Sequence, residues 1–500
     1  MAMIENLAIG FEAALTFQNL AYCFLGVFLG TLIGVLPGIG PVPTIAMLLP
    51  ITFALEPLTG LIMLAGIYYG AQYGGSTTAI LVNLPGEASS VVTCLDGYQM
   101  ARKGKAGAAL AVAALGSFFA GTVGTAVLAA FAPLLTGLAI QFGPADYFSL
   151  MALGLVLAVF LSSGSVPKSV AMVILGILLG LVGTDVSTGA QRFTLGSIHL
   201  IDGLDFVALA MGIFGVVEVV TNIERGTARD IFTNAVGKLR LSREDARAAA
   251  GASLRGTVLG SVLGVLPGGG GILASFSAYA LEKKISRHPE KFGTGVIEGV
   301  AGPESANNAA AQTAFVPLLT LGLPSNAVMA LMVGAMMIHN IAPGPQVISS
   351  NPTLFWGLVA SMWIGNAMLV VLNLPLINIW VKFLTVPYRI LYPIILAFCC
   401  IGVYSIGNNA FDVVILAIFA LVGYLFAKLD CPPAPLLLGF VLGPLMEENL
   451  RRALQLSRGS MTTFVSNPIS FSILMLILLV LIVSILPSIQ KKRSVAFEED

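Results

Sequence analysis

Residues 30–50, GTLIGVLPGIGPVPTIAMLLP, contain the motif that decides the fold, and a related stretch returns at residues 260–280, GSVLGVLPGGGGILASFSAYA. In both copies an apolar run meets a Gly-Val-Leu-Pro-Gly break and then resumes. Proline lacks a backbone N–H and glycine adopts unusual dihedral angles, so a continuous helix is not expected at either break. In a membrane, irregular backbone survives only where protein or a water-filled cavity satisfies its polar groups. A break that recurs in two halves of a chain therefore points to a transporter binding site.

The composition places the chain in a membrane. Of its 500 residues, 57% are hydrophobic and only 10% are charged, and the mean hydropathy is +0.93. A soluble protein carries about 25% charged residues. Many apolar runs reach the length of about 18 residues that marks a membrane-spanning helix. We therefore expect an all-α polytopic membrane protein with roughly 11–12 transmembrane segments.

The same sequence argues against several functions. The net charge is zero, so a nucleic-acid partner has no electrostatic support. The five cysteines show no C-x-x-C spacing, so neither a zinc site nor a disulfide framework is indicated. There is no H-E-x-x-H motif and no P-loop, and no strand precedes the loose dinucleotide fingerprint at residues 269–274. We expect no enzyme activity, no cofactor and no resident metal, and the energy must come from an ion gradient or another chain.

The two breaks divide the chain into halves that follow the same order of apolar segments, and in the second half we expect single apolar segments over residues 354–383 and 436–445. We expect a first membrane repeat over residues 1–222, a charged cytoplasmic connector over 223–255, a second membrane repeat over 256–460, and an extra C-terminal transmembrane helix and tail over 461–500. Each repeat contains one Pro-Gly-broken, re-entrant segment. The alternative is that the two Pro-Gly breaks resemble each other by accident.

The positions of the basic residues set the expected orientation of the halves. Cytoplasmic loops collect Lys and Arg. Most basic residues fall on one side if each half crosses the membrane an odd net number of times, so that the repeats are inverted and the N-terminus is periplasmic. Four arginines fall on the other side and the rule does not explain them: Arg192, Arg451, Arg452 and Arg458.

A second pair of stretches places small polar residues in apolar surroundings: TAILVNLPGEAS at 78–89 and PLLTLGLPSNAVM at 317–329. The amides at a helix break bind anions, because a helix N-terminus carries partial positive charge. Freed carbonyls and hydroxyls near the same break coordinate a transient Na⁺. The alternative is that small residues only let helices pack closely. The substrate-binding and ion-binding residues expected at the breaks are Pro37, Gly38, Gly40, Ser76, Thr77, Asn83, Pro85, Gly86, Ser89, Pro267, Gly268, Gly270, Thr320, Pro324, Ser325 and Asn326.

Glu304 is the most distinctive single residue. It lies in GPESANNAAAQTAF with Asn307, Asn308 and Gln312, and on a helix these four side chains share one face. Such a polar stripe is expensive in lipid, so it faces protein or water. We expect Glu304, Asn307 and Asn308 to serve in ion or proton coupling or in substrate contact. The alternative is that the stripe lines a solvated vestibule.

Four stretches also resemble a known family: GVLPGIGPVPTIAMLLP, YGGSTTAILVNLPGEASSVVTCLDGYQMARKGKAGAAL (73–110), GTDVSTGAQRFTLGSIHLIDGLDFVALAMGIFGVVEV (183–219) and GVLPGGGGILASFSAYALEKK. They resemble the large membrane subunit, the TctA type, of tripartite tricarboxylate transporters. The resemblance covers nearly the whole chain. It implies a multi-pass permease of the bacterial inner membrane, a small four-helix membrane subunit and a periplasmic solute-binding protein as partners. It also implies citrate or another organic acid as substrate, and a coupling cation.

The leading interpretation is secondary uptake of a carboxylate by alternating access, in which one bundle that carries both breaks moves against the other. A passive organic-anion channel is a second interpretation. A membrane-embedded enzyme is a third, and it would need clustered titratable groups that the sequence lacks.

Overall fold

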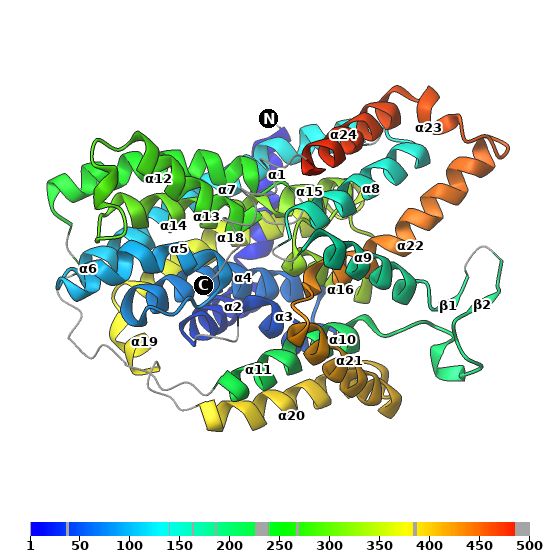
Figure 1. Cartoon of the computed structure of the whole chain (residues 1–500), viewed down its shortest axis with the longest axis horizontal. Helices are drawn as coiled ribbons and strands as arrows, with labels where there is room; N and C mark the ends of the chain where they lie inside the picture. The colour runs from blue at the N-terminus through cyan, green and yellow to red at the C-terminus, as the bar shows by residue number, and fades with distance from the viewer. Residues whose placement is uncertain are drawn as a thin grey trace.

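The computed structural model describes residues 2–36, 40–139, 141–162, 165–185, 188–225, 239, 241–266, 270–383 and 388–485, and helices dominate this part of the chain (Figure 1). Five of its helices are long and apolar enough to cross a membrane, at 17–35, 106–139, 206–224, 352–373 and 410–428, and six shorter apolar helices accompany them. The strands described are β1 (Gly183–Thr184) and β2 (Gln191–Arg192), which form a small antiparallel hairpin. The expected all-α polytopic membrane protein is confirmed.

The first half contains these elements, where η marks a 3₁₀ or π turn: α1 (Ala2–Ala14), α2 (Phe17–Val35), α3 (Pro41–Thr52), α4 (Pro57–Val82), η1 (Ala88–Ser90), α5 (Val91–Thr93), η2 (Cys94–Tyr98), α6 (Gln99–Arg102), α7 (Ala106–Ala139), α8 (Pro144–Phe160), α9 (Val166–Gly180), β1, β2, η3 (Ile198–Leu200), α10 (Phe206–Ala210), η4 (Met211–Val216) and α11 (Val217–Arg225).

The second half contains α12 (Arg243–Leu263), α13 (Gly270–Ile285), η5 (Pro289–Lys291), α14 (Glu298–Thr313), α15 (Phe315–Leu321), α16 (Ala327–Ile338), α17 (Gln346–Ser350), α18 (Pro352–Asn373), α19 (Ile377–Phe383), α20 (Tyr388–Gly407), α21 (Ala410–Lys428), α22 (Pro433–Leu456), α23 (Thr463–Ser466) and α24 (Pro468–Ile485).

Both expected breaks separate helices. In the first half α2 ends at Val35 and α3 begins at Pro41, after Gly40 with a φ of 62°. In the second half α12 ends at Leu263 and α13 begins at Gly270. The second pair of breaks also ends helices with the chain in the left-handed conformation, at Asn83 (φ 56°) and Gly322 (φ 72°). The left-handed residue that ends the helix therefore occurs at matching positions of both halves.

In each half, glycines spaced four residues apart bring the helix before the break into contact with the backbone of the second helix after the break. A Cβ on these glycines would stand 2.1–2.6 Å from a backbone carbonyl oxygen, closer than side-chain atoms approach. In α2 the contacts pair Gly26 with Met63, Gly30 with Ile67 and Gly34 with Ala71 of α4. In α12 they pair Gly256 with Gly302, Gly260 with Ala306 and Gly264 with Ala310 of α14. Within each half the paired residues are separated by the same number of residues along the chain, so the glycines of one helix face successive turns of the other.

The remaining helices pack across the two halves in reciprocal pairs. Helix α9 packs against α22 (Figure 1). Helix α21 packs against η4. Near the breaks, α3 contacts α16 and α13 contacts η1. The central helices α4 and α14 are buried along nearly their whole length, so their polar side chains face protein rather than lipid.

Two sequence expectations about segment ends were wrong. An apolar segment expected over 436–445 is part of α22, which continues to Leu456 because its charged turns pair internally: Arg451 with Glu447 and Arg452 with Glu448. A single segment expected over 354–383 is two helices, α18 and α19. The cytoplasmic connector stays a prediction: its last part, from Arg243, belongs to α12, and residues 226–238 lie outside the described residues.

Candidate functional site

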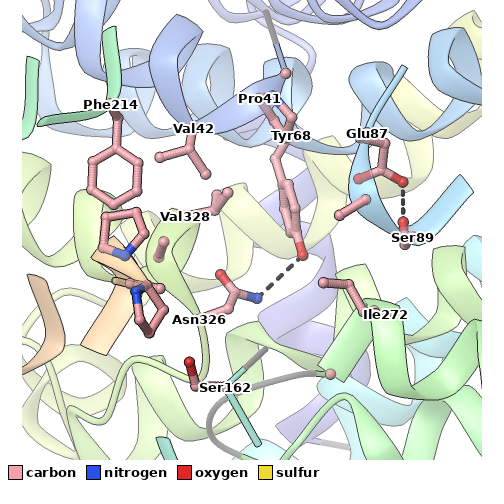
Figure 2. Close-up of a pocket in the computed structure, with 18 of the residues that line it drawn as sticks. Pro41, Val42, Tyr68, Glu87, Ser89, Ser162, Phe214, Ile272, Asn326 and Val328 are labelled. Carbon is pink, nitrogen blue, oxygen red and sulfur yellow. Dashed lines mark hydrogen bonds between the residues drawn. The ribbon is translucent and has the colours of Figure 1, made fainter. Parts of the chain in front are cut away.

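A cavity of about 600 Å³ lies where the breaks of both halves meet. Its wall includes the first turns of α3, α13, α16 and α22, the 85–89 segment with its short η1 turn, and side chains of α4, the end of α8, η4 and α11. Figure 2 shows Pro41 and Val42 of the first half facing the same space as Ile272, Asn326 and Val328 of the second. Segments far apart in sequence thus form one site.

Helix N-termini give this cavity its polar character. The first four N–H groups of a helix lack partners within the helix and carry partial positive charge. Helix α13 offers several such groups at Gly271, Ile272 and Leu273, whereas prolines at 41 and 43 remove two of those of α3. In α16, the Asn326 side chain accepts the Met329 N–H at 2.9 Å, which leaves the N–H groups of Ala327 and Val328 at the cavity. The cavity can therefore receive an anion through backbone amides.

The charged side chains on the cavity wall are acidic. Among the described residues that line it, none is Lys, Arg or His, and the carboxylates are Glu87 and Glu218. An anionic ligand would be repelled by these carboxylates unless their charge is compensated. The site therefore combines amide donors for an anion with carboxylates that attract a cation.

Glu87 was missed by the sequence reasoning, although it stands in the quoted TAILVNLPGEAS stretch. It follows the Pro85–Gly86 break and accepts a hydrogen bond from Asn307 Nδ2 at 3.0 Å, so it joins η1 to α14. Ser89 also donates to the same carboxylate oxygen (Figure 2). The signal that could have found it is its position: Glu87 follows Leu-Pro-Gly where Asn326 follows Leu-Pro-Ser in the other half.

The Asn326 side chain makes the counterpart contact of the second half. Its Nδ2 donates to the Tyr68 hydroxyl at 3.3 Å (Figure 2). The Pro85–Gly86 break of the first half thus contacts α14, the central helix of the second half, through Glu87 and Asn307. The break before α16 in the second half contacts α4, the central helix of the first half, through Asn326 and Tyr68. Both contacts lie at the cavity wall, since Glu87, Tyr68 and Asn326 all line it.

Glu304 lies in the interior, away from the cavity wall. It is 1% exposed, and its two carboxylate oxygens accept hydrogen bonds from the hydroxyls of Ser76 and Thr93. A space of only about 10 Å³ lies beside Ser76, between Tyr73, Thr77 and Ser117. A space of that size holds about one water molecule. The expected polar stripe of α14 is therefore buried among helices in this structure rather than open to a solvated vestibule.

The structure brings some of the expected site residues together and separates others. Six of them line the cavity: Gly40, Pro85, Gly86, Ser89, Gly270 and Asn326. Asn307 reaches it through Glu87, and Ser76 and Asn308 belong to the surroundings of Glu304, where Asn308 Nδ2 donates to Ser117 at 2.7 Å.

The other expected site residues lie apart from the cavity wall. Asn83 is exposed at the end of α4. Pro324 is buried. The hydroxyls of Thr77, Thr320 and Ser325 donate to backbone carbonyls of Tyr73, Val316 and Ala314. Four residues of the Pro-Gly motifs lie outside the described residues: Pro37, Gly38, Pro267 and Gly268.

Three of the four unexplained arginines pair with carboxylates. Arg192 of the β hairpin binds Glu447 of α22 at 2.8 Å and also binds Asp185. Arg451 contacts the same two carboxylates, and Arg452 pairs with Glu448. The ion pairs show how these arginines are stabilised, but they remain exceptions to the topology rule, which counts Lys and Arg rather than net charge.

Residues 20–438 match a family model described as "Tripartite tricarboxylate transporter TctA family". The chain is 59% identical, over the full length of both proteins, to the "Uncharacterized 52.8 kDa protein in TAR-I ttuC' 3'region" of Agrobacterium vitis. It is 61% identical over 241 residues to the "Uncharacterized protein in TAR-II ttuC' 3'region" of the same organism, which covers 48% of this chain and 100% of that relative. No solved structure matches. Every described residue that lines the cavity lies inside the range of the family match.

Proposed function

The chain belongs to the tripartite tricarboxylate transporter TctA family, a multi-pass membrane component of these transporters, and on that premise we propose that it is their permease subunit, importing citrate-like tricarboxylates or related organic acids. Uptake is driven by a Na⁺ or H⁺ gradient across the bacterial inner membrane. A small four-helix membrane subunit and a periplasmic solute-binding protein are its proposed partners.

The observation that carries this proposal is the cavity at the helix breaks. Its wall offers the N-terminal amides of α13 and α16 and contains no basic side chain among the described residues. Backbone amides at helix N-termini hold a carboxylate without a buried arginine or lysine. A cavity of about 600 Å³ is within the range of pockets that enclose small organic ligands.

The acidic wall supports coupling to a cation. Glu87 and Glu218 face the space into which a substrate carrying several carboxylates would enter. Entry of a cation or protons together with the substrate would offset this repulsion. Glu304 is a second candidate for binding the coupling cation or proton. Its buried carboxylate accepts hydrogen bonds from two hydroxyl groups, which do not neutralise its charge.

Alternating access is the proposed mechanism. The reciprocal packing of α9 with α22 and of α21 with η4 is the pattern that two inverted-topology repeats produce. The contacts of Glu87 with Asn307 and of Asn326 with Tyr68 join the halves at the cavity wall. Exchange of the conformations of the two halves would open the cavity first to one side and then to the other.

Substrate protection of single cysteines tests the position of the site. In a cysteine-free background, Val42→Cys and Ile272→Cys place thiols on opposite walls of the cavity. Citrate and other organic acids should slow the reaction of both thiols with a membrane-permeant maleimide. A cysteine at exposed Ile198, which lies outside the candidate membrane spans and does not line the cavity, is the control and should react at an unchanged rate. Unprotected thiols at both cavity positions, under conditions where the protein transports, would remove the cavity as the substrate site.

A further inference from the structure

We propose that Glu87, Ser89, Gln72 and Asn307 form a binding site for a monovalent cation of the sodium type on the wall of the cavity. The inference rests on the proposed function, because it names ligands for the coupling cation. It differs from the Glu304 assignment in its location, since Glu87, Ser89 and Gln72 line the cavity and Glu304 does not.

The cluster brings together five side-chain oxygens: two of Glu87 and one each of Gln72, Ser89 and Asn307. The single hydroxyl proton of Ser89 is shared between Gln72 Oε1, at 3.1 Å, and a carboxylate oxygen of Glu87. Asn307 directs its NH₂ group to Glu87 at 3.0 Å. This orientation leaves Asn307 Oδ1 without a donor, although the residue is only 1% exposed. A buried acceptor without a partner is unfavourable unless another group satisfies it, and a cation satisfies several at once.

The unpartnered oxygen faces the same space as the Ser89 hydroxyl. Asn307 Oδ1 lies 3.2 Å, and Ser89 Oγ 3.9 Å, from the point where a Cβ on Gly271 would stand. Gly271 is in the first turn of α13 and lines the cavity. Because glycine has no Cβ, the protein leaves this point free between oxygens contributed by both halves.

The charge and the number of ligands favour a monovalent metal cation. Glu87 is the one carboxylate of the cluster, so a monovalent ion neutralises it, whereas a divalent ion would leave an uncompensated positive charge in a largely buried place. Carboxylate, amide and hydroxyl oxygens are hard ligands of the kind that alkali and alkaline-earth ions prefer. A single proton on Glu87 would satisfy one acceptor, while both Gln72 Oε1 and Asn307 Oδ1 compete for donors.

The other half lacks this property at the matching position. Asn326 uses its Oδ1 for the Met329 N–H at 2.9 Å and its Nδ2 for the Tyr68 hydroxyl at 3.3 Å, so its amide is satisfied and uncharged. The cavity therefore carries one cation site, on the side of Glu87. A cation there would neutralise the Glu87 carboxylate next to the α13 N-terminus and so raise the affinity of the cavity for an anionic substrate. By linkage, the bound substrate would raise the affinity of the site for the cation by the same factor.

Sodium-dependent thermal stability of the purified permease in detergent, without substrate or partners, tests the site directly. Sodium chloride is titrated against choline chloride at constant ionic strength and at several fixed pH values. A ligand that binds only the folded state stabilises it by an amount that grows with the logarithm of the ligand concentration once that concentration exceeds the dissociation constant. We expect such a rise of the melting temperature in the wild type, and at least about a tenfold higher sodium concentration for the same rise in Glu87→Gln, which lacks the charged ligand.

Three further variants separate the site from general effects of charge and folding. Gly271→Ala keeps every charge but places a methyl group among the oxygens, and Ser89→Ala removes one ligand, so both should weaken the sodium response even if Glu87→Gln does not fold. Glu12→Gln makes the same change of charge at an exposed residue of α1 that does not line the cavity, and it should respond to sodium as the wild type does.

Two results would overturn the proposal. One is a sodium response that is unchanged in Gly271→Ala and Ser89→Ala. The other is a wild type whose stability depends on pH but is equal in sodium and choline, which would assign the cluster to a proton. Because this assay needs no transport, a clear sodium response with no gradient-driven uptake would refute the proposed function and leave the site intact.

Discussion

Gly260→Ala tests the close packing of α12 on α14. A Cβ at this position would stand 2.1 Å from the carbonyl oxygen of Ala306, whereas Cβ atoms essentially never approach within 3.0 Å of another heavy atom. Relief of the clash requires the two backbones to separate by about 1 Å, and overpacking of this kind costs about 1–3 kcal/mol of stability. The displaced helix α14 carries Glu304 and Asn307, so we expect a loss of both thermal stability and uptake.

The assay compares melting temperatures in detergent with uptake by reconstituted protein. Gly30→Ala is the matched variant of the first half, because its Cβ would stand 2.4 Å from the carbonyl oxygen of Ile67, and it should lose stability similarly. Gly137→Ala of α7 is the control, since no atom lies within 4 Å of its added Cβ, and it should be neutral or stabilising by up to about 1 kcal/mol. A melting temperature of Gly260→Ala equal to that of the wild type would refute the packing argument.

Three further predictions concern charge and orientation. Glu304→Gln should lose gradient-driven accumulation yet retain exchange of internal for external substrate, and normal accumulation with an unchanged cation dependence would remove Glu304 from coupling. Asp96→Ala should destabilise the 292–297 loop by about 1.5–3 kcal/mol for each lost hydrogen bond, because the buried Asp96 carboxylate accepts from the N–H groups of Gly293 and Gly295. Hydrogen exchange of this loop measures the change, and unchanged protection would contradict it. Cysteines at Ala8 and Ala235 in a cysteine-free background should differ in labelling by an impermeant reagent on intact cells, and equal labelling would reject the inverted arrangement.

The helix breaks were predictable because their cause is local. Proline and glycine act on the backbone of their own segment. The start of α3 after Gly40 and the start of α13 at Gly270 therefore follow from the sequence. The polar stripe of Glu304 was predicted to face protein or water, because its spacing on one helical face makes exposure to lipid costly, and the structure buries it among helices.

The wall of the cavity was only partly predictable because it depends on contacts between segments distant in sequence. Glu87 gains its importance from Asn307, which lies on a helix of the other half. Conversely, small polar residues such as Thr320 looked like ligands but donate to a carbonyl one turn earlier in their own helix. A sequence pattern does not distinguish a hydroxyl that satisfies its own helix from one that faces a ligand.

The length of α22 was misjudged for a related reason. The hydrophobic pattern ends where Glu447 begins a charged turn, but pairing of Glu447 with Arg451 allows the helix to continue. The same carboxylate also binds Arg192 of the β hairpin, a contact between segments about half the chain apart that no local rule anticipates.

Concentrative uptake tests the central claim, that this permease uses a cation gradient to import an organic acid. Proteoliposomes that contain the permease and its small membrane subunit are supplied with the binding protein and labelled citrate or a related acid, with an imposed Na⁺ or H⁺ gradient. We predict accumulation above the external concentration and its release when an ionophore abolishes the gradient. An internal concentration that only reaches the external one, with or without the gradient, would contradict the account and identify a passive channel.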